Sequence, residues 1–247
     1  MREVDDGELK VIHTKLLELL CAFRDICDRE EIFYSLCAGT MLGAVRHNGF
    51  IPWDTDADVM IWLPDKERFR EAFGRNKPEG IALKNHNAEP KCLQSHDTLY
   101  FEEEQIVEGI HLDIYPMVGA PSEHGEQARF SKYTHIADKI IRSKYKKIKN
   151  CRKKNRLPVA VVKAFDHLIP DSILRKNIYN RETKYNFESS DHIILLSNYG
   201  RREECMPKSI WDKMIHHEFE GQLFQIPSEW DTYLTRIYGD YMTPKKY

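Results

Sequence analysis

The sequence predicts an α+β fold in which a mixed β-sheet is flanked by helices and followed by a mainly helical C-terminal part. Apolar residues recur at helical spacing from Leu9 to about Asp28, which predicts a long amphipathic helix with one buried face. Short apolar segments then predict strands, among them Ile32–Leu36 and His111–Tyr115. Later in the chain the longer periodic segments are helical. We therefore expect a core over residues 1–120 and a mainly helical part over residues 121–247 that packs on it, with no clear linker between them.

The composition is that of an ordinary globular protein without an extreme charge. Of the 247 residues 41% are hydrophobic and 31% are charged, and the formal net charge is -2. No global field points to nucleic acid, so we expect no nucleic-acid partner. The apolar runs are far shorter than the roughly 20 residues that span a bilayer, the N-terminus lacks the pattern of a signal peptide, and the six cysteines form no CxxC pair. We therefore expect a cytoplasmic protein with reduced thiols.

Three aspartates spaced two residues apart, Asp54, Asp56 and Asp58, lie at the start of the apolar segment that ends at Trp62. Because residues i and i+2 of a strand point to the same face, Asp56 and Asp58 are expected side by side at one end of a strand. Adjacent carboxylates repel each other, and burying them is costly unless a cation compensates their charge. Mg²⁺ and Mn²⁺ prefer carboxylate oxygens and commonly bridge to phosphate. The pattern predicts a metal-dependent enzyme that acts on a phosphate; the alternative is a set of solvated turn residues or helix caps.

A glycine turn precedes the aspartates. Gly39 and Thr40 follow a predicted strand and begin a short helix, expected from Met41 to about His47. The free backbone N–H groups of a helix N-terminus bind anions, so we predict a phosphate cradle at Gly39 and Thr40. Arg46 is predicted to clamp phosphate with its planar guanidinium, and a surface ion pair is the alternative. Trp53 is predicted to shape the approach to the aspartates, and a place in the core is the alternative.

A further aspartate lies in the predicted strand His111–Tyr115, which is expected to end at Pro116. Asp113 is flanked by two large apolar residues, and a carboxylate on a central strand needs a partner. If this strand lies beside the strand that carries Asp58, the carboxylates converge. Asp113 is therefore predicted to join the acidic site as a ligand or a base.

A basic run extends from Lys139 to Arg156, with ten Lys or Arg among eighteen residues and no acid. Such a run is usually a solvated face. The functional alternative is a platform for an anionic partner, which would be a phosphate-rich glycopolymer, a lipid-linked sugar diphosphate or the anionic cytoplasmic leaflet of a membrane. Peripheral membrane contact through this run, at the inner face of the membrane, is thus one of the hypotheses that the sequence leaves open.

Three segments carry a resemblance to a known family: GTMLGAVRHNGFIPWDTDADVMI, HLDIYPM and FEGQLFQIPSEWDTYLTRIYGDYM. They resemble the LicD family, whose members have a nucleotidyltransferase-like fold, include bacterial phosphocholine transferases and are similar to the fukutin-type ribitol-phosphate transferases. The resemblance implies that residues 1–120 form the catalytic core and that Asp56, Asp58 and Asp113 are catalytic and bind Mg²⁺ or Mn²⁺. Thr55 interrupts the family's usual run of aspartates, which leaves Asp54 as a less secure ligand.

The activity implied by this resemblance is the metal-dependent transfer of a phospho-alcohol group. The first choice is phosphocholine from CDP-choline, with a sugar of a cell-surface glycan, teichoic acid, lipopolysaccharide precursor or lipid-linked oligosaccharide as acceptor. The alcohol rests on the resemblance alone, so ribitol phosphate or glycerol phosphate from the corresponding CDP-alcohol are alternatives. Two other classes are a nucleotidyltransferase that transfers the nucleotide itself and a non-catalytic scaffold that binds glycan or membrane through the basic run.

Overall fold

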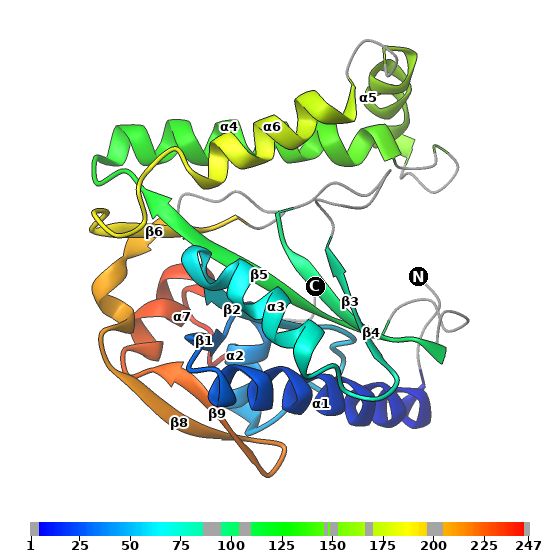
Figure 1. The fold of residues 1–247 in the computed structure, drawn as a ribbon, viewed down its shortest axis with the longest axis vertical. Helices are drawn as coiled ribbons and strands as arrows, with labels where there is room; N and C mark the ends of the chain where they lie inside the picture. Colours follow the sequence, from blue (N-terminus) through cyan, green and yellow to red (C-terminus); the bar gives the residue numbers. More distant parts are fainter. Residues whose placement is uncertain are drawn as a thin grey trace.

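The computed structural model describes residues 5–85, 95–103, 110–145, 148, 153–165, 170–196 and 205–244, and it shows an α+β protein (Figure 1). The predicted fold class is therefore confirmed. The described α-helices are α1 Asp6–Arg29, α2 Ala38–His47, α3 Lys66–Arg75, α4 His124–Tyr145, α5 Lys153–Ala164, α6 Asp171–Glu182 and α7 Trp230–Tyr238. The described strands are β1 Tyr34–Leu36, β2 Ala57–Trp62, β3 Ile81–Asn85, β4 Asp97–Phe101, β5 His111–Ala120, β6 His192–Leu195, β7 Cys205–Pro207, β8 Met214–Phe219 and β9 Gln222–Pro227.

One mixed sheet contains seven of the described strands, and its main order is β1-β2-β5-β4-β3. β2 and β5 pair in parallel, whereas the other neighbours in this order are antiparallel. The second half of β5 pairs with β6, and β6 pairs with β7. Strands from the C-terminal half thus extend the sheet begun by the N-terminal half. The division into residues 1–120 and 121–247 stays a prediction, and the two stretches share one sheet.

Helices pack on the sheet and complete its core (Figure 1). α1 begins with a capping box, in which Asp5 accepts the backbone N–H of Glu8, and its apolar residues are buried at the spacing that the sequence predicts. α4 contributes Phe130 to a second apolar cluster, and α6 lies beside α4, held by a buried ion pair of 2.8 Å between Arg181 and Asp138. None of the helices in the described part of the chain has both the length and the apolar composition needed to cross a bilayer. The residues of α1 that are fully buried in the core include Leu16, Leu19, Leu20 and Phe23.

β5 continues through Pro116 to Ala120, so the expectation that this strand ends at Pro116 is wrong. On one edge of β5, Ile114 is the last residue paired with β4 and Met117 is the first paired with β6. Pro116 falls between them, where its missing N–H interrupts neither ladder on that edge. A proline is therefore tolerated in a central strand because the strand changes partners at that point.

A hairpin of β8 and β9 holds the loop that leads to the aspartates. Glu220 and Gly221 form its turn with φ values of 51° and 72°, as a tight two-residue hairpin turn requires. The Glu220 N–H donates to the carbonyl oxygen of Asn48 at 2.9 Å, and its Oε1 accepts the N–H of Phe50 at 3.0 Å. A Cβ on Gly49 would lie 2.1 Å from Glu220 Oε1, so only glycine allows this approach. The hairpin is not predicted from the sequence, because three consecutive polar residues, His216 to Glu218, interrupt the apolar residues of its first strand.

Candidate active site

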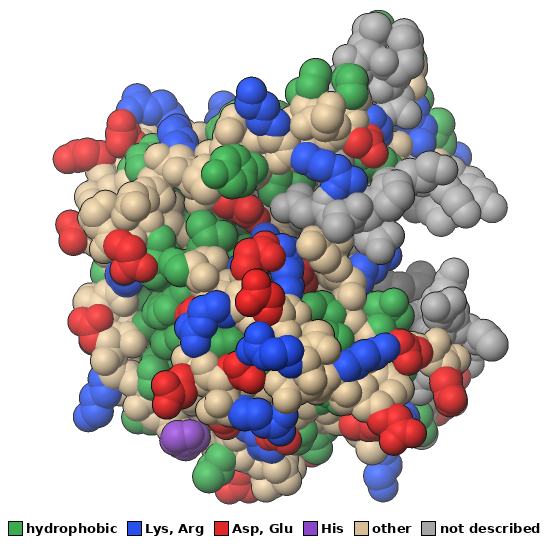
Figure 2. Space-filling model, in the orientation of Figure 1, with side chains coloured by type: hydrophobic (Ala, Val, Ile, Leu, Met, Phe, Trp, Pro, Cys, Tyr) green, Lys and Arg blue, Asp and Glu red, His purple; other side chains and the backbone are tan. Residues whose placement is uncertain are grey.

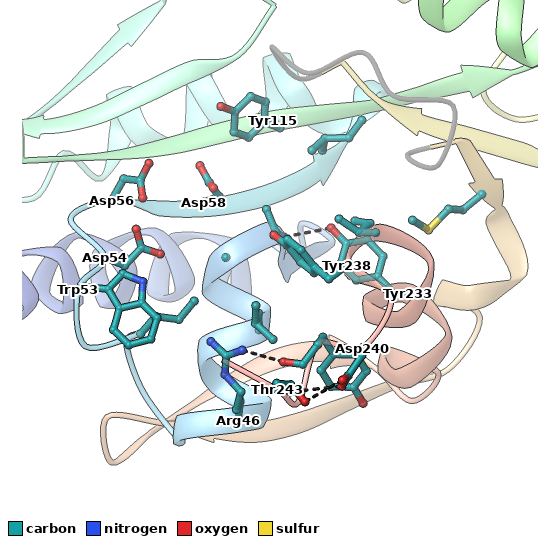
Figure 3. Close-up of a pocket in the computed structure, with 18 of the residues that line it drawn as sticks. Arg46, Trp53, Asp54, Asp56, Asp58, Tyr115, Tyr233, Tyr238, Asp240 and Thr243 are labelled. Atoms are coloured by element: carbon teal, nitrogen blue, oxygen red, sulfur yellow. Dashed lines mark hydrogen bonds between the residues drawn. The ribbon is translucent and has the colours of Figure 1, made fainter. Parts of the chain in front are cut away.

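A cavity of about 570 Å³ opens between the N-terminal end of α2, the loop before β2 and the C-terminal segment that includes α7 (Figure 3). This volume is within the usual range of small-molecule sites, about 300–1,000 Å³. Acidic residues line one end and aromatic or apolar residues line much of the rest. The described lining residues are Ala38, Gly39, Leu42, Arg46, Ile51, Trp53, Asp54, Asp56, Asp58, Tyr115, Met117, Leu195, Met206, Tyr233, Ile237, Tyr238, Asp240, Tyr241 and Thr243.

The predicted aspartates are brought together by the pairing of two strands. β2 and β5 are adjacent and parallel, and Asp58 is in register with Asp113, as the convergence hypothesis requires. Asp56 directly precedes β2, and Asp54 lies in the loop before it. Figure 3 shows Asp54, Asp56 and Asp58 gathered at one end of the cavity. Asp113 lies one strand further on and is not among the lining residues.

The surroundings of Asp54 and Asp58 raise the proton affinity of both carboxylates. Burial raises the pKa of Asp58 well above its usual range, and repulsion from Asp56, Asp113 and Asp54 raises it further. Burial, a hydrogen bond with Asp56 and repulsion from Asp56 together raise the pKa of Asp54 to about 7. Without a cation, these two carboxyl groups therefore hold their protons more tightly, because their negative charges would repel at a partly dry site. A bound cation would relieve that repulsion.

Arg46 is the only Lys or Arg among the described residues that line the cavity. Its Nη1 donates to the carbonyl oxygen of Tyr241 at 2.7 Å, and its Nε donates to His47 Nε2 at 3.0 Å. At 1.5 Å rise per residue, Arg46 lies roughly 10 Å along the axis of α2 from Gly39. The predicted cradle and the predicted clamp would therefore contact different parts of one elongated ligand.

The turn into α2 is shaped by an unusual backbone conformation. Cys37 is the N-cap and makes no side-chain capping bond, so the helix end is not closed by the serine, threonine or aspartate that usually caps it. Ala38 has φ of 45°, in the left-handed region that costs free energy for a residue with a side chain. Its N–H donates to the hydroxyl of Tyr233 at 3.0 Å, a contact that holds this strained turn.

Gly39 and Thr40 lie in the first turn of α2, where backbone N–H groups have no carbonyl partner within the helix. A Cβ on Gly39 would lie 3.1 Å from Asp54 Oδ2, so glycine lets the carboxylate approach the helix N-terminus closely. The hydroxyl oxygen of buried Thr40 accepts the backbone N–H of Asp58 at 2.8 Å. Thr40 thus helps to position Asp58, a task that its sequence context did not indicate. Its role in binding phosphate stays a prediction.

Asp113 is oriented by a set of polar neighbours. Its Oδ1 accepts the hydroxyl of Thr98 at 2.8 Å, and its Oδ2 accepts the hydroxyl of Tyr115 at 3.4 Å. The Nε2 atoms of His96 and His111 lie 3.6 and 3.8 Å from Oδ1. Burial, with added repulsion from His111, lowers the pKa of His96 to about 3, so His96 is neutral near pH 7. The hydroxyl groups of Thr98 and Tyr115 are therefore the hydrogen-bond partners that a carboxylate on a central strand needs.

The arrangement fits a metal ion whose coordination is completed by the phosphates of its substrate. Within the described ranges, no three His, Cys, Asp or Glu side chains are arranged to hold a metal ion by themselves. Magnesium at phosphate-transfer sites is commonly bound by one or two carboxylates, with substrate phosphates and water as the other ligands. Asp56 and Asp58 offer such a pair beside a helix N-terminus. The assignment of Asp56, Asp58 and Asp113 as metal ligands stays a prediction.

The residues that sequence reasoning missed come mainly from the C-terminal segment. Tyr233, Tyr238 and Asp240 line the cavity from α7 and the turn that follows it (Figure 3). The helix ends at Gly239, whose φ of 68° turns the chain back toward α2. An acid next to a helix-ending glycine is a weak local signal, because many such acids lie in solvent. Only the packing of α7 against α2 identifies these residues.

Trp53 and the basic run Lys139–Arg156 were also singled out by the sequence, and they lie in different parts of the molecule. Trp53 lines the cavity and is 42% exposed, which fits a residue that shapes the approach rather than one in the core. The basic run Lys139–Arg156 spans the end of α4 and the start of α5, and residues 146–147 and 149–152 lie outside the described residues. Where it is described, the run contributes nothing to the cavity lining.

The chain is similar to a known protein over most of its length. The family described as "LicD/FKTN/FKRP, nucleotidyltransferase domain" matches residues 31–146. The chain is 32% identical to the lipopolysaccharide cholinephosphotransferase LicD of Haemophilus influenzae, over 92% of this chain and 88% of that protein. Uncharacterised proteins of Rickettsia typhi and Rickettsia prowazekii are 28% and 29% identical over 41% and 32% of this chain, and 33% and 30% of their own lengths. The extent of these matches and the two paired strands with their aspartates lead to one conclusion: the chain belongs to the LicD family.

Proposed function

We propose that this protein transfers phosphocholine from CDP-choline to a sugar of a lipopolysaccharide-type acceptor, with Mg²⁺ or Mn²⁺ as cofactor. The observation that carries the proposal is a cavity in which clustered carboxylates face the N-terminus of a helix. Carboxylates suit a divalent cation and a helix N-terminus suits phosphate, so together they suit a metal-bound diphosphate. The Haemophilus influenzae relative is a lipopolysaccharide cholinephosphotransferase, which supports phosphocholine as the transferred group.

In the proposed reaction the acceptor hydroxyl attacks the phosphorus that bears choline, and the bond from that phosphorus to the oxygen of CMP breaks. Asp56 and Asp58 would hold the metal, which would neutralise charge on the leaving CMP. The N–H groups of Gly39 and Thr40 would bind phosphate oxygens, and Arg46 would bind a more distant part of the donor. Asp113 lies next to Asp58 but does not line the cavity, so it would accept the proton of the acceptor hydroxyl through a water molecule.

The aromatic part of the cavity supports choline as the alcohol. Trp53, Tyr115, Tyr233 and Tyr238 line it together with Asp240. A trimethylammonium group is attracted to the faces of aromatic rings and to a nearby carboxylate. Ribitol and glycerol carry hydroxyl groups instead, and these need hydrogen-bond partners rather than ring faces. The lining thus offers ring faces to choline and hydroxyl or carboxylate groups to ribitol and glycerol, so the choice of choline rests mainly on the activity of the Haemophilus influenzae relative.

The test is release of CMP from CDP-choline, CDP-ribitol and CDP-glycerol, with Mg²⁺, Mn²⁺ or EDTA and a glycan-lipid extract as acceptor. We expect release from CDP-choline alone, only with metal, and choline label in the acceptor. Release of CMP from CDP-ribitol or CDP-glycerol instead would show that the transferred group carries another alcohol, while the proposed type of reaction would still hold. Nucleotide label in the acceptor would show a nucleotidyltransferase. A folded protein that binds neither metal nor any of these donors would overturn the proposal.

The difference in stability between wild type and an Asp54 variant should depend on pH, because the pKa of Asp54 is raised by its crowded surroundings. Native Asp54 has its pKa raised to about 7, whereas an aspartate of the unfolded chain titrates at about 3.9. The native protein therefore binds this proton more tightly, and the resulting stability, complete below about pH 4, is lost as the pH rises to about 7. Asp54→Asn removes the titration. In EDTA, we expect the variant to gain on the order of 1–3 kcal/mol of unfolding free energy relative to wild type between about pH 4.5 and about pH 7.5.

Urea unfolding of both proteins at several pH values measures this difference. Titrating groups far from the cavity cancel in it because the two chains share them, whereas the coupling of Asp54 with Asp56 and Asp58 is part of the measured effect. A difference that stays constant across the range would show that Asp54 is not held at a raised pKa.

A further inference from the structure

Exposed hydrophobic side chains concentrate on one layer of the molecule. Of 13 large hydrophobic residues that are exposed in the described part of the chain, nine lie between Tyr133 and Tyr179, in or next to α4, α5 and α6. Single exposed apolar residues are common on protein surfaces, but a concentration of this kind marks an interaction surface. The nine are Tyr133, Ile136, Ile140, Ile148, Leu157, Val161, Phe165, Ile173 and Tyr179.

Two of these helices carry their exposed apolar residues as outward stripes. On α4, Tyr133, Ile136 and Ile140 follow the i, i+3, i+7 spacing of one helix face, while the buried residues of α4, among them Phe130 and Ile141, lie on an adjoining face. The α4 stripe therefore exists in addition to the stripe that packs on the protein. Packing of α4 on the rest of the protein does not require this exposed apolar stripe.

On α5 the stripe is more exposed still. Leu157, Val161 and Phe165 recur every four residues and are 75%, 50% and 54% exposed, with Phe165 just beyond the helix end. Val159, between the first two, is buried. α5 thus also presents one apolar face to the protein and another to its surroundings.

The same layer is strongly basic. In the sequence, residues 122–182 contain 16 Lys or Arg and 6 Asp or Glu, some of them outside the described residues, in a chain whose formal net charge is -2. Lys132 and Lys139 are exposed on α4 near its apolar stripe. Figure 2 shows hydrophobic side chains mixed with Lys and Arg side chains over the region of these helices. An apolar surface rimmed by positive charge is complementary to a bilayer with anionic headgroups, which accepts apolar side chains between negative charges.

We propose that the layer of α4, α5 and α6 docks on an anionic lipid surface. The apolar stripes enter the headgroup region, and the Lys and Arg side chains around them approach the anionic headgroups. The proposal is independent of the activity proposed above, because it concerns a surface that does not line the cavity.

Co-sedimentation with lipid vesicles tests this docking. Wild-type protein is expected to bind vesicles that contain phosphatidylglycerol, to bind vesicles of phosphatidylcholine alone much more weakly, and to lose affinity as salt is raised. The double variant Leu157→Glu/Val161→Glu is expected to bind at least about tenfold more weakly, because it removes two apolar side chains and adds two negative charges. The matched control is Val11→Glu/Leu223→Glu, which changes residues that are 60% and 56% exposed outside the layer and should bind like wild type.

Thermal unfolding of each variant establishes that it is folded. Equal losses of binding in the test and control variants would overturn the proposal, as would equal binding to both kinds of vesicle or to neither. A dimer of wild-type protein that dissociates in Leu157→Glu/Val161→Glu, without any vesicle binding, would also overturn it and assign the surface to a second copy of the chain.

Discussion

Asp58→Asn is expected to lower the rate of CMP release by about a thousandfold or more while the protein stays as stable as wild type in EDTA. The asparagine keeps the shape of the side chain but removes one of the charges that would hold the metal, and electrostatic stabilisation of this kind contributes several kcal/mol. Stability should not fall, because the substitution relieves the repulsion that Asp58 experiences from the neighbouring aspartates. Steady-state kinetics with CDP-choline and urea unfolding in EDTA measure the two effects.

The combination of these outcomes distinguishes a chemical role from a structural one. A matched control is Asp212→Asn, which makes the same change at an exposed position outside the cavity and should leave the rate unchanged. A rise in KM with an unchanged kcat would assign Asp58 to substrate binding only. A large loss of stability would mean that Asp58 supports the fold.

Glu182→Gln is expected to destabilise the protein by about 3–5 kcal/mol, because it breaks a buried ion pair and leaves one charge without its partner. Lys66 Nζ donates to Glu182 Oε1 and to the carbonyl oxygen of Ser95, both at 2.7 Å, and both charged side chains are 7% exposed. The pair joins the start of α3 to the end of α6, and Ser95 lies just before β4. For a chain of this size the expected decrease in Tm is about 10 °C.

Two further variants separate burial from charge. The double variant Lys66→Met/Glu182→Met should recover much of the lost stability, since well-packed apolar side chains replace a buried ion pair at little cost. Glu102→Gln breaks the pair between Lys77 and Glu102, whose side chains are 49% and 47% exposed, and should cost less than about 1 kcal/mol. If Glu182→Gln costs no more than Glu102→Gln, the buried pair does not hold α6 to the core.

Prediction from sequence succeeded where the signal lies within a few residues. The period of apolar residues predicts α1, and the period of two in the segment around Asp58 predicts a strand with carboxylates at its start. The apolar neighbours of Asp113 identify a second buried strand, and the structure pairs the two strands in register. The end of β5 was predicted wrongly because a proline breaks a strand only where its N–H is needed, and that depends on the neighbouring strand.

Prediction failed where residues far apart in the chain meet. Arg46 bonds to Tyr241 and Ala38 bonds to Tyr233, and each pair is separated by 195 residues. The hairpin contact of Glu220 with Phe50 is of the same kind. No local pattern encodes such contacts, because they result from how whole elements pack.

The sequence by itself thus determined the fold class and the acidic cluster, since both depend on spacing within single strands and helices. Only the tertiary structure decided which C-terminal residues close the cavity, that Thr40 supports Asp58, and that α4 and α5 keep apolar stripes exposed. The physical reason is that periodicity reveals which face of an element is apolar, whereas the partner that covers that face, or leaves it open, is chosen by the packing of the whole chain.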